Sequence, residues 1–169
     1  MSETGRCRER LKHFCEGNGL DLGYGGDPIV PWAITVDLPQ PYVQYEPHAP
    51  QHLKGDATRL SWFNDGVLDF VYSSHLLEDF EDTAEVMKEW LRVLRYGGYL
   101  VLYLPDEQAF RAHCQKTGQE VNDHHKHVDF SLGFVLKLMT EETMGRPFQV
   151  VHSAAHVDDY GFELVIRAD

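Results

Sequence analysis

Residues 68–105 read LDFVYSSHLLEDFEDTAEVMKEWLRVLRYGGYLVLYLP, and this stretch decides the fold. Its start, residues 68–73, is apolar enough for a buried strand, and residues 99–104 form a second, nearly continuous apolar run. Between them, apolar side chains recur at helical spacing over residues 81–95, with two glycines just past the end as a stop signal. The stretch therefore predicts a strand, an amphipathic helix and a second strand.

The same alternation extends in both directions along the chain. Short apolar runs predict strands at residues 20–24, 32–38, 53–57, 148–152 and 162–167, and helical spacing predicts helices at residues 3–15 and 130–139. Strands that are apolar on both faces and alternate with helices are typical of an α/β fold. We therefore expect a mostly parallel sheet that is covered by helices on both faces.

Composition narrows the class of protein. The chain has 169 residues without repeats or linkers, so we expect a single domain over residues 1–169. No apolar run could span a membrane and the N-terminus is charged rather than apolar, so we expect a cytoplasmic protein without a membrane partner. The net charge of −12 would repel phosphate backbones and disfavours nucleic acid as a partner. Cys7, Cys15 and Cys114 show no zinc or redox spacing, and we expect reduced structural thiols.

Suggestive residues follow four of the predicted strands, where parallel sheets bind ligands. Residues 21–26 read DLGYGG, a tight turn that would bring backbone close to a ligand, although a dinucleotide fingerprint would need glycine where Pro28 stands. Asp37 could accept hydrogen bonds from both hydroxyls of a ribose, and Asp56 from an adenine amine. Each residue alone is more often a turn or cap residue. Four such strand ends in this order along the chain, the last at residues 73–75, favour a nucleoside site.

These segments together resemble class I S-adenosylmethionine-dependent methyltransferases and, more narrowly, the type 11 methyltransferase domain. The resemblance runs from about Leu20 to Asp106 and is most specific over residues 68–106. It implies a Rossmann-like, doubly wound α/β sheet of about seven strands, mostly parallel, with an antiparallel C-terminal strand. It also implies a lead segment (1–17), a donor-binding half (18–106) and an acceptor-side half (107–169).

The resemblance further implies which residues bind the cofactor, S-adenosylmethionine. The glycine turn would meet the amino-acid part of the donor, Asp37 the ribose, Asp56 the adenine edge, and residues 73–75 the wall beside the sulfonium. The full expected donor-binding set is Asp21, Gly23, Tyr24, Gly25, Asp37, Leu38, Asp56, Ala57, Ser73 and Ser74.

Two departures from the family pattern stand in the glycine loop. Asp27 occupies the position of the usual third glycine, and Pro28 and Pro31 leave no room for a full helix between the first two strands. A non-catalytic module that binds S-adenosylmethionine, S-adenosylhomocysteine or a protein partner is therefore an alternative to an enzyme.

The candidate catalytic residues are histidines. Methyl transfer from a sulfonium needs mainly alignment, but a nearby base can remove a proton from the acceptor. His75 stands beside the expected donor site, and His125 and His127 belong to the loop before the helix at 130–139.

The same loop has two other interpretations. Three histidines within residues 124–127 could bind a metal in a hydrolase, or the loop could simply precede a helix that Asp129 or Ser131 caps. We expect no metal. The acidic run over residues 78–82 is expected to be a solvated helix start.

The expected activity is methyl transfer to a small-molecule or sugar-like acceptor. No motif after Pro105 identifies that acceptor. A partner subunit in a homodimer could close a site that the short N-terminal segment leaves open.

Overall fold

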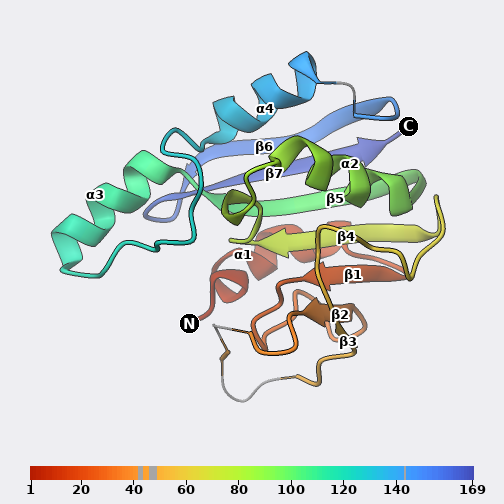
Figure 1. The fold of residues 1–169 in the computed structure, drawn as a ribbon, viewed down its shortest axis with the longest axis horizontal. Coiled ribbons are helices and arrows are strands. Elements are labelled where there is room, and N and C mark those ends of the chain that lie inside the picture. Colours follow the sequence, from red (N-terminus) through yellow and green to blue (C-terminus); the bar gives the residue numbers. More distant parts are fainter. Residues whose placement is uncertain (42–43, 46–48, 143) are drawn as a thin grey trace.

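The seven strands form one sheet with the order β3-β2-β1-β4-β5-β7-β6. Our computed structural model describes residues 1–41, 44–45, 49–142 and 144–169 (Figure 1). The strands are β1 (Gly19–Leu22), β2 (Ile34–Asp37), β3 (Leu53–Lys54), β4 (Leu68–Ser74), β5 (Leu94–Pro105), β6 (Phe148–Val157) and β7 (Gly161–Ala168). The helices are α1 (Glu3–Leu11), α2 (Thr83–Val93), α3 (Glu107–Thr117) and α4 (Leu132–Glu141), with 3-10 turns η1 (Lys12–Phe14) and η2 (Leu77–Asp79).

The strand directions confirm the expected sheet. Strands β1 to β5 pair in parallel, β7 pairs antiparallel with β5, and β6 pairs antiparallel with β7. Among the strands of the described ranges, β7 alone therefore runs against the others. The arrowheads of β1 and β4 point to the side of the molecule on which α3 lies (Figure 1), so this side is the ligand-binding edge.

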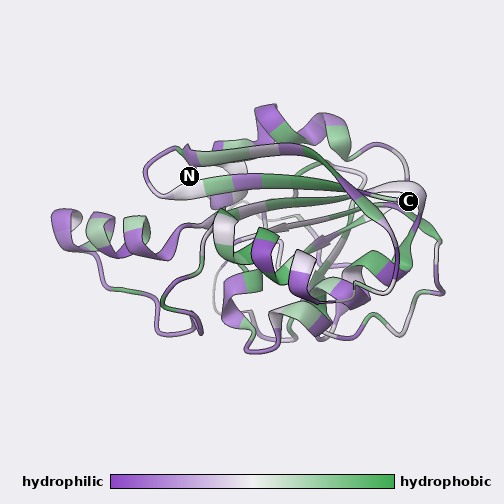
Figure 2. Cartoon of the chain, turned by 90° about the horizontal axis from the view of Figure 1, so that it is seen from above, coloured by the Kyte–Doolittle hydropathy of each residue, from purple (hydrophilic) through white to green (hydrophobic). Residues whose placement is uncertain are grey.

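Helices cover both faces of the sheet because side chains alternate along each strand. Val71 of β4 belongs to the core that α2 and α4 cover, whereas its neighbours Phe70 and Tyr72 pack with Cys7 and Leu11 of α1 on the other face. Viewed from above, apolar strands lie between helices whose outward residues are hydrophilic (Figure 2).

Helix α2 shows why its sequence folds as it does. Asp82 caps its first turn by accepting a hydrogen bond from the Glu85 backbone N–H at 3.1 Å. Trp90 of the apolar face is fully buried and donates from Nε1 to the Ala57 carbonyl at 2.8 Å. The helix is thereby tied to the loop that follows β3.

Helix α3 was not predicted from the sequence. Asp106 caps it through the Ala109 backbone N–H, and Gly118 ends it in the left-handed conformation at φ 72°. An aspartate that caps the start and a glycine twelve positions later that ends the helix are a readable signal, but the segment is only weakly amphipathic and was therefore missed. The expected helix at 130–139 is α4, with Ser131 as its N-cap.

Residues 23–33, between β1 and β2, contain no helix, as the prolines predict. Cys7, Cys15 and Cys114 are buried free thiols, in agreement with the sequence. No helix within the described ranges has both the length and the apolar character to cross a membrane.

Candidate active site

The loops that follow the first four parallel strands meet at one edge of the sheet. The Gly23 N–H donates to the Val36 carbonyl at 2.9 Å, and the Gly55 N–H donates to the Asp37 carbonyl at 2.9 Å. Ser73 in β4 donates from its hydroxyl to the Leu22 carbonyl at 3.0 Å. The four predicted strand ends are therefore neighbours.

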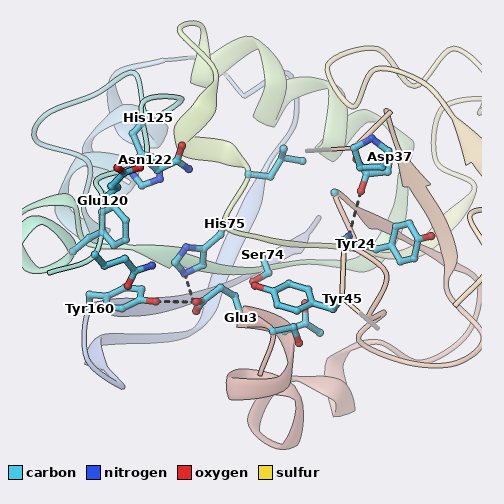
Figure 3. A pocket seen from close by; sticks show the side chains of 18 residues that line it. Glu3, Tyr24, Asp37, Tyr45, Ser74, His75, Glu120, Asn122, His125 and Tyr160 are labelled. Atoms are coloured by element: carbon cyan, nitrogen blue, oxygen red, sulfur yellow. Dashed lines mark hydrogen bonds and ion pairs between the residues drawn. The ribbon is translucent and has the colours of Figure 1, made fainter. Parts of the chain in front are cut away.

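A cavity of about 230 Å³ opens at this edge (Figure 3). It is lined by Ser2, Glu3 and Thr4 before and within α1, by Gly23, Tyr24, Gly25 and Asp37, by Pro41 and Tyr45, by Ser74 at the end of β4 with His75 and Leu76 after it, and by Phe110, Gln119, Glu120, Asn122, His125 and Tyr160 from the C-terminal part. Both halves of the chain contribute to it.

The glycine loop forms one wall of the cavity with its backbone. Gly23 has a φ of 67°, and a Cβ atom there would lie 2.9 Å from Leu76 Cδ2. Gly25 has a φ of 57° and donates from its N–H to Asp37 Oδ2 at 3.2 Å. The other Asp37 oxygen accepts from the Leu38 N–H at 2.8 Å. Only glycine leaves this cradle open, which is the shape that a closely approaching ligand such as the donor needs.

Asp37 is held in place by backbone N–H groups, and no ion pair with a cation is found for it among the described residues. Its side chain is partly buried, and this burial raises its pKa, against the effect of the two backbone hydrogen bonds. Both bonds orient the carboxylate at the end of β2, where Figure 3 shows it at the rim of the cavity. Its acceptor oxygens are fixed before any ligand arrives.

Contacts with α1 hold the compressed glycine loop. Asp27, which replaces the third glycine, is hydrogen-bonded to the Ser2 hydroxyl and ion-paired with Arg8. Asp21 points inward, is 1% exposed and accepts from the Ile29 N–H at 2.6 Å. Segment 1–8 therefore supplies the compensating contact that the missing helix and glycine require.

The opposite wall contains His75 in a left-handed conformation. Its φ of 49° is uncommon for a residue other than glycine, and such residues are concentrated at functional sites. Nε2 of His75 lies 3.5 Å from Glu3 Oε2, whose other oxygen accepts from the Tyr160 hydroxyl at 2.8 Å. Burial, and then the neighbouring His125, lower the pKa of His75 to about 3. The imidazole is therefore neutral at pH 7.

His125 is fixed between two buried carboxylates. Its Nδ1 donates to Glu107 Oε2 at 2.6 Å, and its Nε2 lies 3.7 Å from Glu78 Oε1. Glu78 and Glu107 are 1% and 0% exposed. Burial, and then the adjacent Asp79, raise the pKa of Glu78 well above its usual range.

The expectation that residues 78–82 form a solvated helix start is therefore wrong for Glu78. The 3-10 turn η2 precedes α2 and directs this side chain inward, whereas α2 itself begins only at Thr83. The helix dipole that motivated the expectation acts on Asp82 and Glu85 instead.

Of the predicted donor-binding residues, five line the cavity: Gly23, Tyr24, Gly25, Asp37 and Ser74. The other five, Asp21, Leu38, Asp56, Ala57 and Ser73, lie close to the same sheet edge but outside the cavity lining. Asp56 accepts from the Thr58 N–H at 2.8 Å, and Ala57 packs in the core. Trp62 lies against Gly55 in this region and remains 47% exposed.

Of the three predicted catalytic histidines, two line the cavity and one does not. His75 and His125 line the cavity, but His127 does not. His127 donates from Nε2 to the Phe80 carbonyl at 2.9 Å and contacts Thr83 Oγ1 at 3.0 Å, so it connects its loop to the start of α2.

Several cavity residues could not be found from the sequence. Glu3, Phe110 and Tyr160 belong to segments without a motif and meet only through packing. For Glu107 a partial signal exists, because it follows the helix cap Asp106. Nothing in the sequence indicates that Glu107 faces His125.

Comparisons with known proteins agree with this geometry. A family model described as a methyltransferase domain matches residues 20–102. A SAM-dependent methyltransferase from Archaeoglobus fulgidus has the same fold, with a TM-score of 0.69 at 16% identity over 97% of this chain and 92% of that chain. One from Thermotoga maritima gives a TM-score of 0.64 at 21% identity, covering 99% of this chain and 87% of that chain. No curated protein sequence matches the chain.

The family match over residues 20–102 and the shared fold support a class I S-adenosylmethionine-dependent methyltransferase. They indicate S-adenosylmethionine as the cofactor. A Haloferax volcanii structure of the same fold is a complex with the Trm112 methyltransferase activator, with a TM-score of 0.63 at 15% identity over 98% of this chain and 87% of that chain.

Proposed function

We propose that this protein transfers a methyl group to a small molecule or sugar-like acceptor that enters the cavity between the glycine loop and His125. The single observation that carries the proposal is the position of the two ends of the cavity. Tyr24 and Asp37 of the glycine loop and β2 lie at one end and His125 lies at the other, with His75 between them (Figure 3).

The donor end is built to bind the cofactor through backbone and one carboxylate. The open cradle at Gly23 and Gly25 accommodates the amino-acid part, and Asp37 accepts from the ribose hydroxyls. Asp56 and Ala57, which lie at the same sheet edge but outside the cavity lining, would contact the adenine. When bound, the cofactor supplies a methyl carbon on a positively charged sulfur, and its transfer leaves the carbon–sulfur electron pair on a neutral thioether.

The acceptor end presents aromatic faces and hydrogen-bonding groups. Phe110 and Tyr160 pack edge to face at 5.3 Å between ring centroids, and Asn122, Gln119 and Glu120 provide polar groups. Such a lining suits a small hydroxylated or amine-bearing molecule. The carboxylates Glu3 and Glu120 and the net charge of −12 disfavour a nucleic acid.

The chain aligns the acceptor and removes its proton. Alignment of reactants can supply about 7–11 kcal/mol of the barrier reduction, and a base adds roughly 100-fold or more. Neutral His75 is the first candidate for accepting that proton by its position next to the donor loop, although its lowered pKa makes it a weak base. His125, oriented by Glu107, is the second candidate, and His127 acts only through the position of its loop.

The experiment has two parts. Calorimetry with S-adenosylhomocysteine tests the donor site, and release of S-adenosylhomocysteine from S-adenosylmethionine, measured with a panel of small alcohols, sugars and amines, tests the acceptor. We expect binding by the native protein and turnover with at least one hydroxyl or amine compound. Absence of binding would reject the assigned donor site, and turnover on nucleic acid alone would reject the assigned acceptor class.

A further inference from the structure

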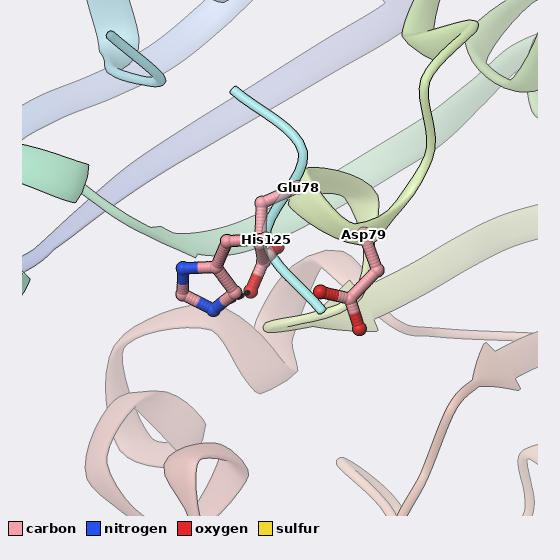
Figure 4. A group of neighbouring side chains, drawn as sticks. All are labelled: Glu78, Asp79 and His125. Atoms are coloured by element: carbon pink, nitrogen blue, oxygen red, sulfur yellow. Dashed lines mark ion pairs between the residues drawn. The ribbon is translucent and has the colours of Figure 1, made fainter. Parts of the chain in front are cut away.

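A second group of side chains stands behind the acceptor end of the cavity. Glu78, Asp79 and His125 each offer one ligand atom, and these atoms all lie within 4.8 Å of one another (Figure 4). They come from η2 and from the loop before α4, which are brought together by the Lys126 N–H donating to the Glu78 carbonyl at 2.9 Å. Against the expectation of no metal from the sequence, we propose that Glu78, Asp79 and His125 bind a divalent transition-metal ion such as Zn²⁺ or Mn²⁺.

The position of the His125 ring supports a ligand role. Nδ1 faces Glu107 Oε2 at 2.6 Å, so the tautomer that binds a metal would carry its N–H on Nδ1. Nε2 is left with its lone pair, and this lone pair belongs to the atom 3.7 Å from Glu78 Oε1. A carboxylate on the far nitrogen of a metal-binding histidine is the usual arrangement, since it fixes the tautomer and the ring orientation. Glu107 is therefore a positioning residue.

Glu78 provides an independent observation. Its side chain is 1% exposed, and Oε2 has no hydrogen-bond partner among the described residues. A buried carboxylate oxygen without a partner is costly. A cation at this position would remove that cost.

Distances favour a metal ion over an organic ammonium group. Two ligands bound at about 2.1 Å in tetrahedral geometry lie roughly 3.4 Å apart. Two acceptors of one ammonium, each at about 2.8 Å, would lie roughly 4.6 Å apart. The separation of 3.7 Å between Glu78 Oε1 and His125 Nε2 is close to the first value, and all three ligand atoms lie within 4.8 Å of one another. One imidazole nitrogen with carboxylate oxygens suits Zn²⁺, Mn²⁺ or Fe²⁺ better than Ca²⁺.

The position also suggests what the ion would do. His125 lines the cavity, so an open coordination position would face the acceptor. An ion there would bind an acceptor oxygen and lower the pKa of its hydroxyl, which would replace the base role of His125, because Nε2 would then be a ligand; this role rests on the proposed function. Metal binding itself does not depend on that function.

The test uses the full chain without a histidine tag, stripped with a chelator and exchanged into metal-free buffer. Zn²⁺ and, separately, Mn²⁺ are titrated by calorimetry, and elemental analysis follows gel filtration. We expect one ion per chain for at least one metal, and a rise in melting temperature of roughly 5–10 °C at 100-fold excess over the Kd. Glu78→Gln and His125→Gln should each weaken binding at least 100-fold, and Glu107→Gln by about 10- to 100-fold.

His124→Gln is the matched control, because His124 is exposed in the same loop, and its affinity should stay within twofold of the native value. Melting of each variant without metal shows whether it folds, and Asp79→Asn replaces any variant that does not. Binding that survives in the folded ligand variants, or no stoichiometric binding of either metal, overturns the site. Calorimetry with S-adenosylhomocysteine in the presence of chelator is independent of the ion, so a failed metal site and a failed donor site give different results.

Discussion

The donor end and the acceptor end of the cavity are built in different ways. The donor end is mostly backbone: Gly23 and Gly25 shape it, and Asp37 is held by two main-chain N–H groups. The acceptor end consists of side chains from distant segments, with Glu3 bonded to Tyr160 and Glu107 bonded to His125. The first construction suits the cofactor, which is the same in every cycle, and under our proposal the second can vary with the acceptor.

The largest expected effect concerns the backbone of the donor end. Gly23→Val places a β-branched residue at a φ of 67° and drives Cβ toward Leu76. We expect affinity for S-adenosylhomocysteine, measured by calorimetry, to fall by more than about 100-fold, together with roughly 2 kcal/mol of stability.

Gly118→Val is the matched control for this change. Gly118 has a φ of 72°, and a Cβ atom there would meet nothing within 4 Å. The control should lose similar stability and keep its ligand affinity. Equal losses of affinity in both variants would show that strain, and not the cradle, is responsible.

The next effect concerns the carboxylate of the donor end. Asp37→Asn should weaken S-adenosylhomocysteine binding by about 10- to 100-fold, because charge-assisted hydrogen bonds are worth about 1.5–3 kcal/mol. Asp56→Asn should change it less than about threefold, since Asp56 lies outside the cavity lining and bonds within its own turn. The reverse order would place the principal carboxylate contact after β3 instead of β2.

A third prediction separates the two ends. His75→Asn should reduce the turnover number with an accepted substrate by about 10- to 100-fold, with S-adenosylhomocysteine affinity changed less than about threefold. Asparagine tolerates the left-handed backbone at this position. His156→Asn is the control, because His156 shares a positive φ of 58° but is exposed away from the cavity. A large loss of S-adenosylhomocysteine affinity in His75→Asn would instead assign His75 to the donor end.

The smallest expected effect lies under the donor end, in the support of the loop after β3. Glu89 accepts from the Leu60 N–H at 2.7 Å and from Arg92 Nε at 2.8 Å. The Arg92 guanidinium, with the Leu60 N–H, lowers the pKa of Glu89. Glu89→Gln should therefore cost about 0.5–1 kcal/mol at pH 7.

The pH dependence of this cost has a definite sign. A carboxyl whose pKa is lower in the folded state stabilises the fold above its unfolded value, near 4.3, and loses this contribution as the pH falls through the folded value. Urea unfolding of the native protein and of Glu89→Gln at pH 7, 5 and 3 should thus show a difference that is full at pH 7 and 5 and reduced at pH 3. A difference that grows toward pH 3 would contradict the ion pair.

The strands show how far the sequence alone reaches. The apolar runs at 68–73 and 99–104 fall within β4 and β5, because a strand buried on both faces leaves an unambiguous pattern. The segments with mixed composition were harder to interpret, and α3 went unpredicted for this reason. In the site, the glycine turn and Asp37 could be predicted because they follow strands in a fixed topology. The inward contact of Asp21 with the Ile29 N–H could not be predicted, since it depends on the compressed loop.

The sequence by itself determined the order of strands and helices, the sheet edge at which a ligand binds and the glycine turn at the donor end. These features depend on local periodicity and on the direction of parallel strands. Only the tertiary structure decided that α1 holds Asp27 and that η2 buries Glu78 beside His125. Contacts of this kind join residues far apart in the chain, and the free energy that selects them comes from packing and desolvation, which no local pattern records.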